Sequence, residues 1–122
     1  MKILIVDDAK YIVKVFKDML ELHGFEVENA RDGEEALAKY RKLNPNLVIM
    51  DILMPKLDGI SATKKILEYD SEAKIIVVTA VSKFGLEEEC INVGAKAFIR
   101  KPFKIKELLS IVEKTLGDQG GK

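Results

Sequence analysis

The chain has 122 residues, of which 48% are hydrophobic and 33% charged, a composition typical of one soluble globular domain. It carries 20 basic and 20 acidic residues, so its formal net charge is zero, which argues against direct binding to nucleic acid. A single cysteine excludes an internal disulfide, and no apolar run reaches the ~20 residues of a membrane span. We therefore expect a cytoplasmic monomer that does not contact a membrane.

The first half of the chain alternates between strand-like and helix-like patterns. Residues 3–6, "ILIV", are continuously apolar and have the length of a strand. Apolar residues then recur at helical spacing until His23–Gly24, which is a helix stop. The polar run at residues 26–30, "EVENA", is typical of an edge strand. Asp32 can cap a second helix, which ends at "NPN", residues 44–46.

The second half continues the same alternation. In chain order we predict a strand at residues 47–50, a helix after Asp58, a strand at 75–78, a helix from about Lys83 to Val93, a strand at 97–99 and a helix that carries Ile105 to Leu116. The runs "LVIM" and "IIVV" are apolar throughout, which is typical of parallel strands covered on both faces. The pattern predicts an α/β fold of the (βα)5 type, with a parallel five-stranded sheet. We expect one domain over residues 1–117 and a flexible tail over 118–122.

Polar side chains follow the apolar runs where each predicted strand ends. These residues are Asp7, Asp8, Asp51, Thr79 and Lys101. Because the carboxyl ends of parallel strands meet at one edge of a sheet, we expect these side chains to lie together.

Three carboxylates beside one ammonium group repel one another, and a divalent cation would remove this conflict. An all-oxygen set of ligands favours Mg²⁺, or Mn²⁺, over zinc. A carboxylate on such a cation, next to Lys101 and Thr79, is suited to accept a phosphoryl group. The pattern therefore predicts phosphoryl transfer to an aspartate.

These residues, in this order, resemble the receiver domain of response regulators. The resemblance covers about residues 2–116 and rests on "ILIVDD", "LVIMDILMPKLDG", "VVTA" and "FIRKPF" taken together. It implies a flavodoxin-like, doubly wound sheet of strand order 2-1-3-4-5. It also implies a phosphoacceptor switch of a two-component phosphorelay, not an enzyme with turnover.

The resemblance assigns a role to each residue of the predicted site. Asp51 would be the phosphoacceptor and a metal ligand, Asp8 a direct Mg²⁺ ligand, and Asp7 a ligand through water. The backbone carbonyl of Leu53 would complete the metal ligands. The backbone N–H groups of Leu53 and Ala80 would contact the phosphoryl oxygens.

The remaining roles concern the switch and the partners. Lys101 would bind the phosphoryl group, Thr79 and Phe98 would be the switch residues, and the Lys101–Pro102 peptide bond would be cis. The phosphodonor would be a histidine kinase or a histidine phosphotransfer protein. It would dock near the first helix, whose outward face carries Lys10, Lys14 and Lys17. The surface formed by the fourth helix, the fifth strand and the fifth helix would then control an output protein.

Three alternatives compete with this interpretation. A small aspartyl-phosphate phosphatase of the haloacid-dehalogenase type needs a second aspartate two residues after the nucleophile, where this chain has Leu53. A flavin or nucleotide carrier would share the sheet topology, but no glycine-rich phosphate loop follows the first strand. The chain could also be the receiver part of a larger DNA-binding regulator.

The sequence departs from the common receiver pattern at three positions. Phe98 lacks the hydroxyl of the tyrosine that is commoner there. Leu53 and Val81 are apolar where some relatives carry polar groups. We expect these two side chains to shield the phosphoryl group from water and to slow self-dephosphorylation.

Replacing Leu53 by asparagine tests this expectation. A polar side chain admits water to the phosphoryl group, so the acyl phosphate of Leu53→Asn should hydrolyse faster than that of the wild type. The half-life of the acyl phosphate, measured after removal of the phosphodonor, checks this. A half-life that is unchanged or longer in the variant would contradict the shielding role.

Overall fold

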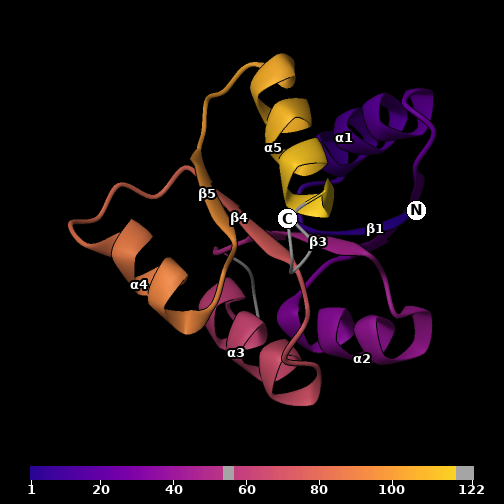
Figure 1. Ribbon diagram of the computed structural model, residues 1–122. Coiled ribbons are helices and arrows are strands. Elements are labelled where there is room, and N and C mark those ends of the chain that lie inside the picture. Colours follow the sequence, from indigo (N-terminus) through magenta and orange to yellow (C-terminus); the bar gives the residue numbers. More distant parts are fainter. Residues whose placement is uncertain (54–56, 118–122) are drawn as a thin grey trace.

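The computed structural model describes residues 1–53 and 57–117, in which strands and helices alternate strictly along the chain (Figure 1). The elements are β1 Lys2–Val6, α1 Lys10–Leu22, β2 Glu26–Ala30, α2 Gly33–Leu43, β3 Leu47–Asp51, α3 Gly59–Tyr69, β4 Ile75–Thr79, α4 Leu86–Val93, β5 Ala97–Arg100 and α5 Ile105–Gly117. The predicted tail, residues 118–122, and residues 54–56 of the quoted motif lie outside the described residues. Within the described part of the chain, no helix is long and apolar enough to cross a membrane.

All five described strands form one parallel sheet of order β2-β1-β3-β4-β5. This confirms the predicted (βα)5 architecture, the strand order and the edge position of "EVENA". The chain runs from β1 outward to β2 and then returns to β3 on the other side of β1. Strand order therefore reverses between β1 and β3, and open α/β sheets bind ligands at the carboxyl end of such a reversal.

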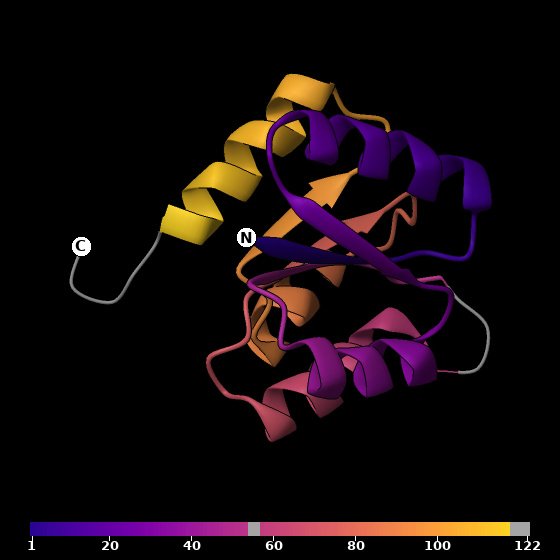
Figure 2. The same ribbon diagram turned by 90° about the vertical axis from the view of Figure 1, so that its right-hand side faces the viewer.

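Helices cover both faces of the sheet, which explains the continuously apolar strands. Successive residues of a strand point to opposite faces. On β1, Ile3 and Ile5 belong to the core beneath α1 and α5, whereas Leu4 and Val6 belong to the core beneath α2 and α3. Figure 2 shows these two helical layers on opposite sides of the sheet. A third, smaller cluster lies beneath α4 and contains Ile52, Val77, Leu86, Cys90 and Ala95.

Aspartates cap two of the helices, α2 and α3. The Asp32 carboxylate accepts a hydrogen bond from the backbone N–H of Glu35 at 2.8 Å, at the start of α2. At the start of α3, the Asp58 carboxylate accepts hydrogen bonds from the N–H groups of Ile60 and Ser61, both at 2.9 Å. Asp58 is therefore a cap of α3, as its sequence position indicates.

The observed boundaries differ from the predicted ones at the starts of β1 and α4 and at the ends of three strands. Strand β1 begins at Lys2, one residue before its apolar run. Helix α4 begins at Leu86 and not near Lys83, because Gly85 has a φ of +79° and cannot continue a right-handed helix. Three strands extend one residue beyond their apolar runs, to Asp51, Thr79 and Arg100. Backbone hydrogen bonding sets the end of a strand, and it continues after the side chains become polar.

The start of α3 approaches β3 so closely that only glycine fits at position 59. A Cβ added to Gly59 would overlap the backbone carbonyl oxygen of Asp51 and lie 2.8 Å from the Cα atom of Ile52. The N–H of Gly59 also donates to the Ile52 carbonyl at 3.0 Å. This contact holds the end of β3, and with it Asp51, against the first turn of α3.

We predict that Gly59→Ala lowers the free energy of unfolding by about 1–3 kcal/mol, because the backbone must shift to admit the methyl group. Urea unfolding of the purified variant measures this loss. Gly117→Ala is the matched control, since a Cβ at Gly117 meets nothing within 4 Å. Equal stability of the two variants would contradict the proposed close approach.

Candidate functional site

Three carboxylates meet at the carboxyl edge of the sheet. One oxygen atom from each of Asp7, Asp8 and Asp51 lies within 4.8 Å of the others. Asp7 and Asp8 directly follow β1, and Asp51 ends the neighbouring strand β3, so the pairing of the two strands brings the acids together. The side chain of Asp7 is buried, that of Asp51 is half-buried, and that of Asp8 is exposed. The oxygen ligands and the repeated negative charge suit a hard divalent cation.

Lys101 is the cation that the protein itself supplies to this cluster. Its Nζ atom lies 3.4 Å from Oδ2 of Asp7, whose other oxygen, Oδ1, accepts the N–H of Ala9 at 2.9 Å. Lys101 directly follows β5, and its N–H donates to the Thr79 carbonyl at 2.8 Å. The Lys101–Pro102 peptide bond is cis, the isomer that the resemblance implied.

Asp51 is a half-buried carboxyl group whose surroundings disfavour its negative charge. Burial is the largest cause that raises its pKa, and the negative charge of Asp7 raises it further. The ammonium group of Lys101 opposes this shift, as do backbone hydrogen bonds from Ile52 and Leu53. The net effect is a raised pKa. An added positive charge would therefore favour the ionised form of Asp51.

Thr79 ends β4 beside the acidic cluster and is fully buried. Its Oγ1 atom accepts a hydrogen bond from the backbone N–H of Val81 at 3.0 Å. The next residue, Ala80, is exposed, as is Leu53, whose side chain is 64% exposed. Phe98 lies apart from the acids: its ring is partly buried against the cluster beneath α4.

A groove of about 530 Å³ adjoins the acidic cluster on the side of α1. Its lining includes Asp7, Asp8, Lys10, Lys14, Lys17 and Arg31. The three lysines that the sequence placed on the outward face of the first helix therefore border the same groove as two of the acids. Lys14 pairs with Asp18 at 2.9 Å, an exposed pair of the kind that contributes little to stability.

Sequence reasoning missed Arg100. This residue ends β5, and its Nη1 atom donates a hydrogen bond to the Val81 carbonyl at 2.7 Å. Its guanidinium carbon lies 5.6 Å from the centroid of the Phe98 ring. The only signal in the sequence was a charged residue between an apolar strand and Lys101, and such a residue is most often solvated.

The fold and the site together define a receiver domain. The chain matches the response regulator receiver domain over residues 3–113 and belongs to that family, whose members are phosphoacceptor switches of two-component signalling. Over 116 residues it is 44% identical to the chemotaxis protein CheY of Bacillus subtilis (strain 168). These residues cover 94% of this chain and 97% of that relative. The resemblance seen in the sequence is thereby confirmed.

Solved structures of relatives support the same assignment. The CheX–CheY–BeF3–Mg²⁺ complex from Borrelia burgdorferi contains a chain 38% identical to this one, with a TM-score of 0.89 over 93% of this chain and 87% of that chain. The response regulator TrrA from Thermotoga maritima, in complex with Mg²⁺ and BeF, is 36% identical, with a TM-score of 0.85 over 93% of this chain and 97% of that chain. Both of these relatives are complexes with Mg²⁺.

The crowding of the three carboxylates predicts that removing one of them stabilises the metal-free protein. Asp8→Asn should raise the free energy of unfolding in EDTA, by less than about 1 kcal/mol because Asp8 is exposed and water screens charges a few ångströms apart. Urea unfolding at low salt measures the change. Glu28→Gln, which removes an exposed carboxylate on β2, is the control and should show no such gain. A loss of stability in Asp8→Asn would show that the cluster is not repulsive.

Proposed function

We propose that this protein accepts a phosphoryl group on Asp51 in a Mg²⁺-dependent reaction and then controls an output protein through its α4–β5–α5 surface. The observation that carries the proposal is the convergence of three carboxylates within 4.8 Å, with Lys101 3.4 Å from one of them, at the reversal of strand order. The phosphodonor is a histidine kinase or a histidine phosphotransfer protein, and the site of action is the cytoplasm.

The residues that would hold the metal ion are Asp7, Asp8 and Asp51, together with the backbone carbonyl of Leu53. Asp7 would act through water, as the resemblance implies; its two oxygens accept hydrogen bonds from Ala9 and Lys101. Mg²⁺, or Mn²⁺, would offset the repulsion of the carboxylates and neutralise oxygens of the incoming phosphoryl group. The complexes of relatives with Mg²⁺ support this assignment.

In the transfer step, a carboxylate oxygen of Asp51 attacks the phosphorus atom of the donor's phosphohistidine. An O–P bond forms, the P–N bond breaks, and its electron pair returns to the imidazole nitrogen. Lys101 pairs with a phosphoryl oxygen, and the backbone N–H groups of Leu53 and Ala80 donate to the others. The half-buried position of Asp51 strengthens each of these interactions relative to water.

The switch step begins at Thr79. Its hydroxyl oxygen already accepts a hydrogen bond from Val81, so its own O–H can donate to a phosphoryl oxygen. The Thr79 side chain moves towards the phosphoryl group and vacates space that the partly buried Phe98 ring can enter. The modification adds roughly −1.5 to −2 charges at neutral pH. This change biases the α4–β5–α5 surface towards its active arrangement.

The groove beside α1 is the docking site that we assign to the phosphodonor. It opens next to Asp8 and is bordered by Lys10, Lys14 and Lys17. A donor bound there would reach Asp51 across the acidic edge of the sheet. These lysines can also serve as solvated surface charges. Exposed charges mainly change the rate of association with the donor, and salt weakens this effect.

Acetyl phosphate, a small phosphodonor, tests the proposal without knowledge of the kinase. With Mg²⁺ the wild type should gain the mass of one phosphoryl group, and the gain should vanish in EDTA and in Asp51→Asn. Intact-protein mass spectrometry measures this. Asp58→Asn is the matched control: it removes a carboxylate outside the cluster, and asparagine also caps helices, so it should be phosphorylated normally. Modification of Asp51→Asn to the same extent would refute the assignment.

A further inference from the structure

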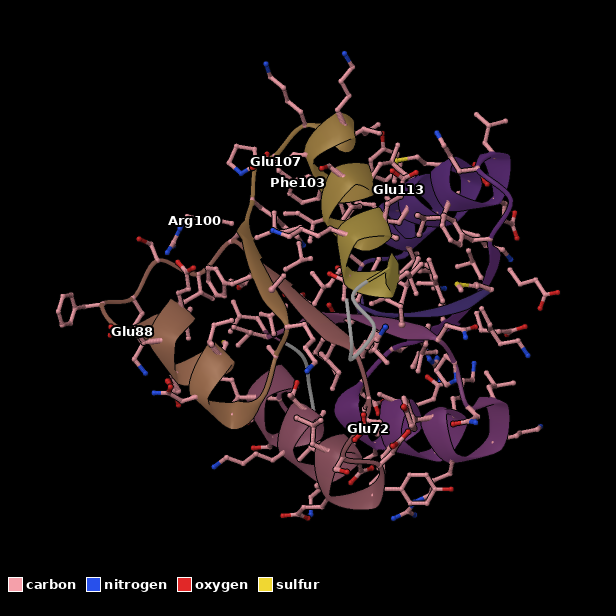
Figure 3. The ribbon with its side chains drawn as sticks, viewed as in Figure 1. Glu72, Glu88, Arg100, Phe103, Glu107 and Glu113 are labelled. Carbon is pink, nitrogen blue, oxygen red and sulfur yellow. The ribbon has the colours of Figure 1, made fainter. Side chains whose placement is uncertain are left out.

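The guanidinium group of Arg100 joins two segments that are distant in the chain. Its Nη1 atom donates to the carbonyl of Val81, in the loop after β4, at 2.7 Å. Its Cζ atom lies 5.6 Å from the centre of the Phe98 ring, within the range of a cation–π contact. Figure 3 shows the Arg100 side chain at the end of β5, on the side of the loop that leads into α4. Within the described residues Arg100 forms no ion pair, so these two contacts define its position.

The register of the sheet places Arg100 next to the switch residues. Thr79 and Arg100 are partners in the parallel pair of β4 and β5. Phe98 is two residues before Arg100, so both side chains point to the same face of the sheet. That face carries Val77 and the cluster beneath α4. Thr79, Arg100 and Phe98 therefore lie near one another on this face of the sheet.

The backbone of Val81 is held from both sides. Its N–H donates to Oγ1 of Thr79 at 3.0 Å, and its carbonyl accepts from Arg100 at 2.7 Å. A movement of the Thr79 hydroxyl must therefore break or displace the first hydrogen bond. A displacement of this loop moves the Val81 carbonyl, and with it the hydrogen-bonded guanidinium group near the Phe98 ring.

Arginine is the side chain that can make both contacts at once. Its guanidinium group is planar, so the edge donates hydrogen bonds while the face rests on an aromatic ring. A charged donor also forms a stronger hydrogen bond to a carbonyl than a neutral donor does. Lysine offers a single ammonium group, which can reach the Val81 carbonyl or the ring but does not present a flat surface to the ring.

We propose that Arg100 is a positioning residue that couples Thr79 to Phe98 through the backbone of Val81. The series of contacts runs from the Thr79 hydroxyl through the two hydrogen bonds of Val81 to the guanidinium group, whose Cζ atom lies 5.6 Å from the centre of the Phe98 ring. The role of this coupling in signalling rests on the proposed function, because phosphorylation of Asp51 is the event that would draw the Thr79 hydroxyl away. The coupling itself exists in the unmodified protein and can be measured there.

The test is a double-mutant cycle read at the Phe98 ring by ¹⁹F NMR. The protein is labelled with 4-fluorophenylalanine, and Phe98→Leu assigns the resonance. Thr79→Val removes the acceptor of the Val81 N–H at nearly constant volume, and it should shift the Phe98 resonance in the wild-type background. In the Arg100→Met background the same substitution should produce at most half of that shift.

Two further variants separate coupling from a general effect of charge. Lys96→Met removes an exposed cation just before β5, and in that background Thr79→Val should still produce the full shift of the Phe98 resonance. Arg100→Lys keeps a cation and a hydrogen-bond donor, so in that background part of the shift should return. An undiminished shift in Arg100→Met, or no shift from Thr79→Val in the wild type, would overturn the proposal.

A second measurement avoids any change at the buried Thr79. Hydrogen exchange of the Val81 amide should be at least several-fold faster in Arg100→Met than in Lys96→Met, because the loop loses one of its two attachments. Equal exchange rates would overturn the proposal. Phosphorylation by acetyl phosphate is assayed on the same samples. Failure of the wild type to gain a phosphoryl group would refute the proposed function and leave the coupling in the unmodified protein as measured.

Discussion

The repulsion among Asp7, Asp8 and Asp51 is the constraint on which the rest of the structure depends. Their oxygens lie within 4.8 Å of one another, and Lys101 compensates only part of this negative charge. Such a cluster opposes folding, so the surrounding structure must hold it in place. The two strands that carry the acids, β1 and β3, are neighbouring interior strands of the sheet, with fully apolar runs buried on both faces. Burial of these strands stabilises an arrangement that the acids alone would not adopt.

The three acids are not equivalent, and their different surroundings divide the chemistry between them. Asp7 is buried and has both oxygens occupied, by the Ala9 N–H and by Lys101. Asp8 is exposed. Asp51 is half-buried with a raised pKa, so an added cation would stabilise its charged form. Asp51 also ends a strand that the close approach at Gly59 holds against α3, which fixes its position.

The sequence predicted the fold and the acidic site well because both depend on local patterns. An apolar run followed by Asp51 or Thr79 reveals a buried strand and the edge at which it ends, and the parallel topology then brings the ends together. The start of α4 was predicted wrongly. In the sequence, Gly85 is a single residue of low helix propensity within a helical pattern, whereas its positive φ prevents the helix from beginning before Leu86. The contacts of Arg100 could not be predicted, because they depend on the path of a loop and the orientation of a long side chain.

The part of the structure next to the proposed switch residues, Thr79 and Phe98, is also the part with the smallest buried core. Helix α4 spans 8 residues, whereas the other described helices span 11 or 13, and the apolar cluster beneath it is the smallest of the three in the described residues. A short helix over a small core loses little apolar contact when it shifts, so its position responds to modest changes in free energy. Val81 and Phe98 border this cluster, and Arg100 links the two. The buried strands thus hold the acids, while the shortest described helix packs over the smallest apolar cluster beside them.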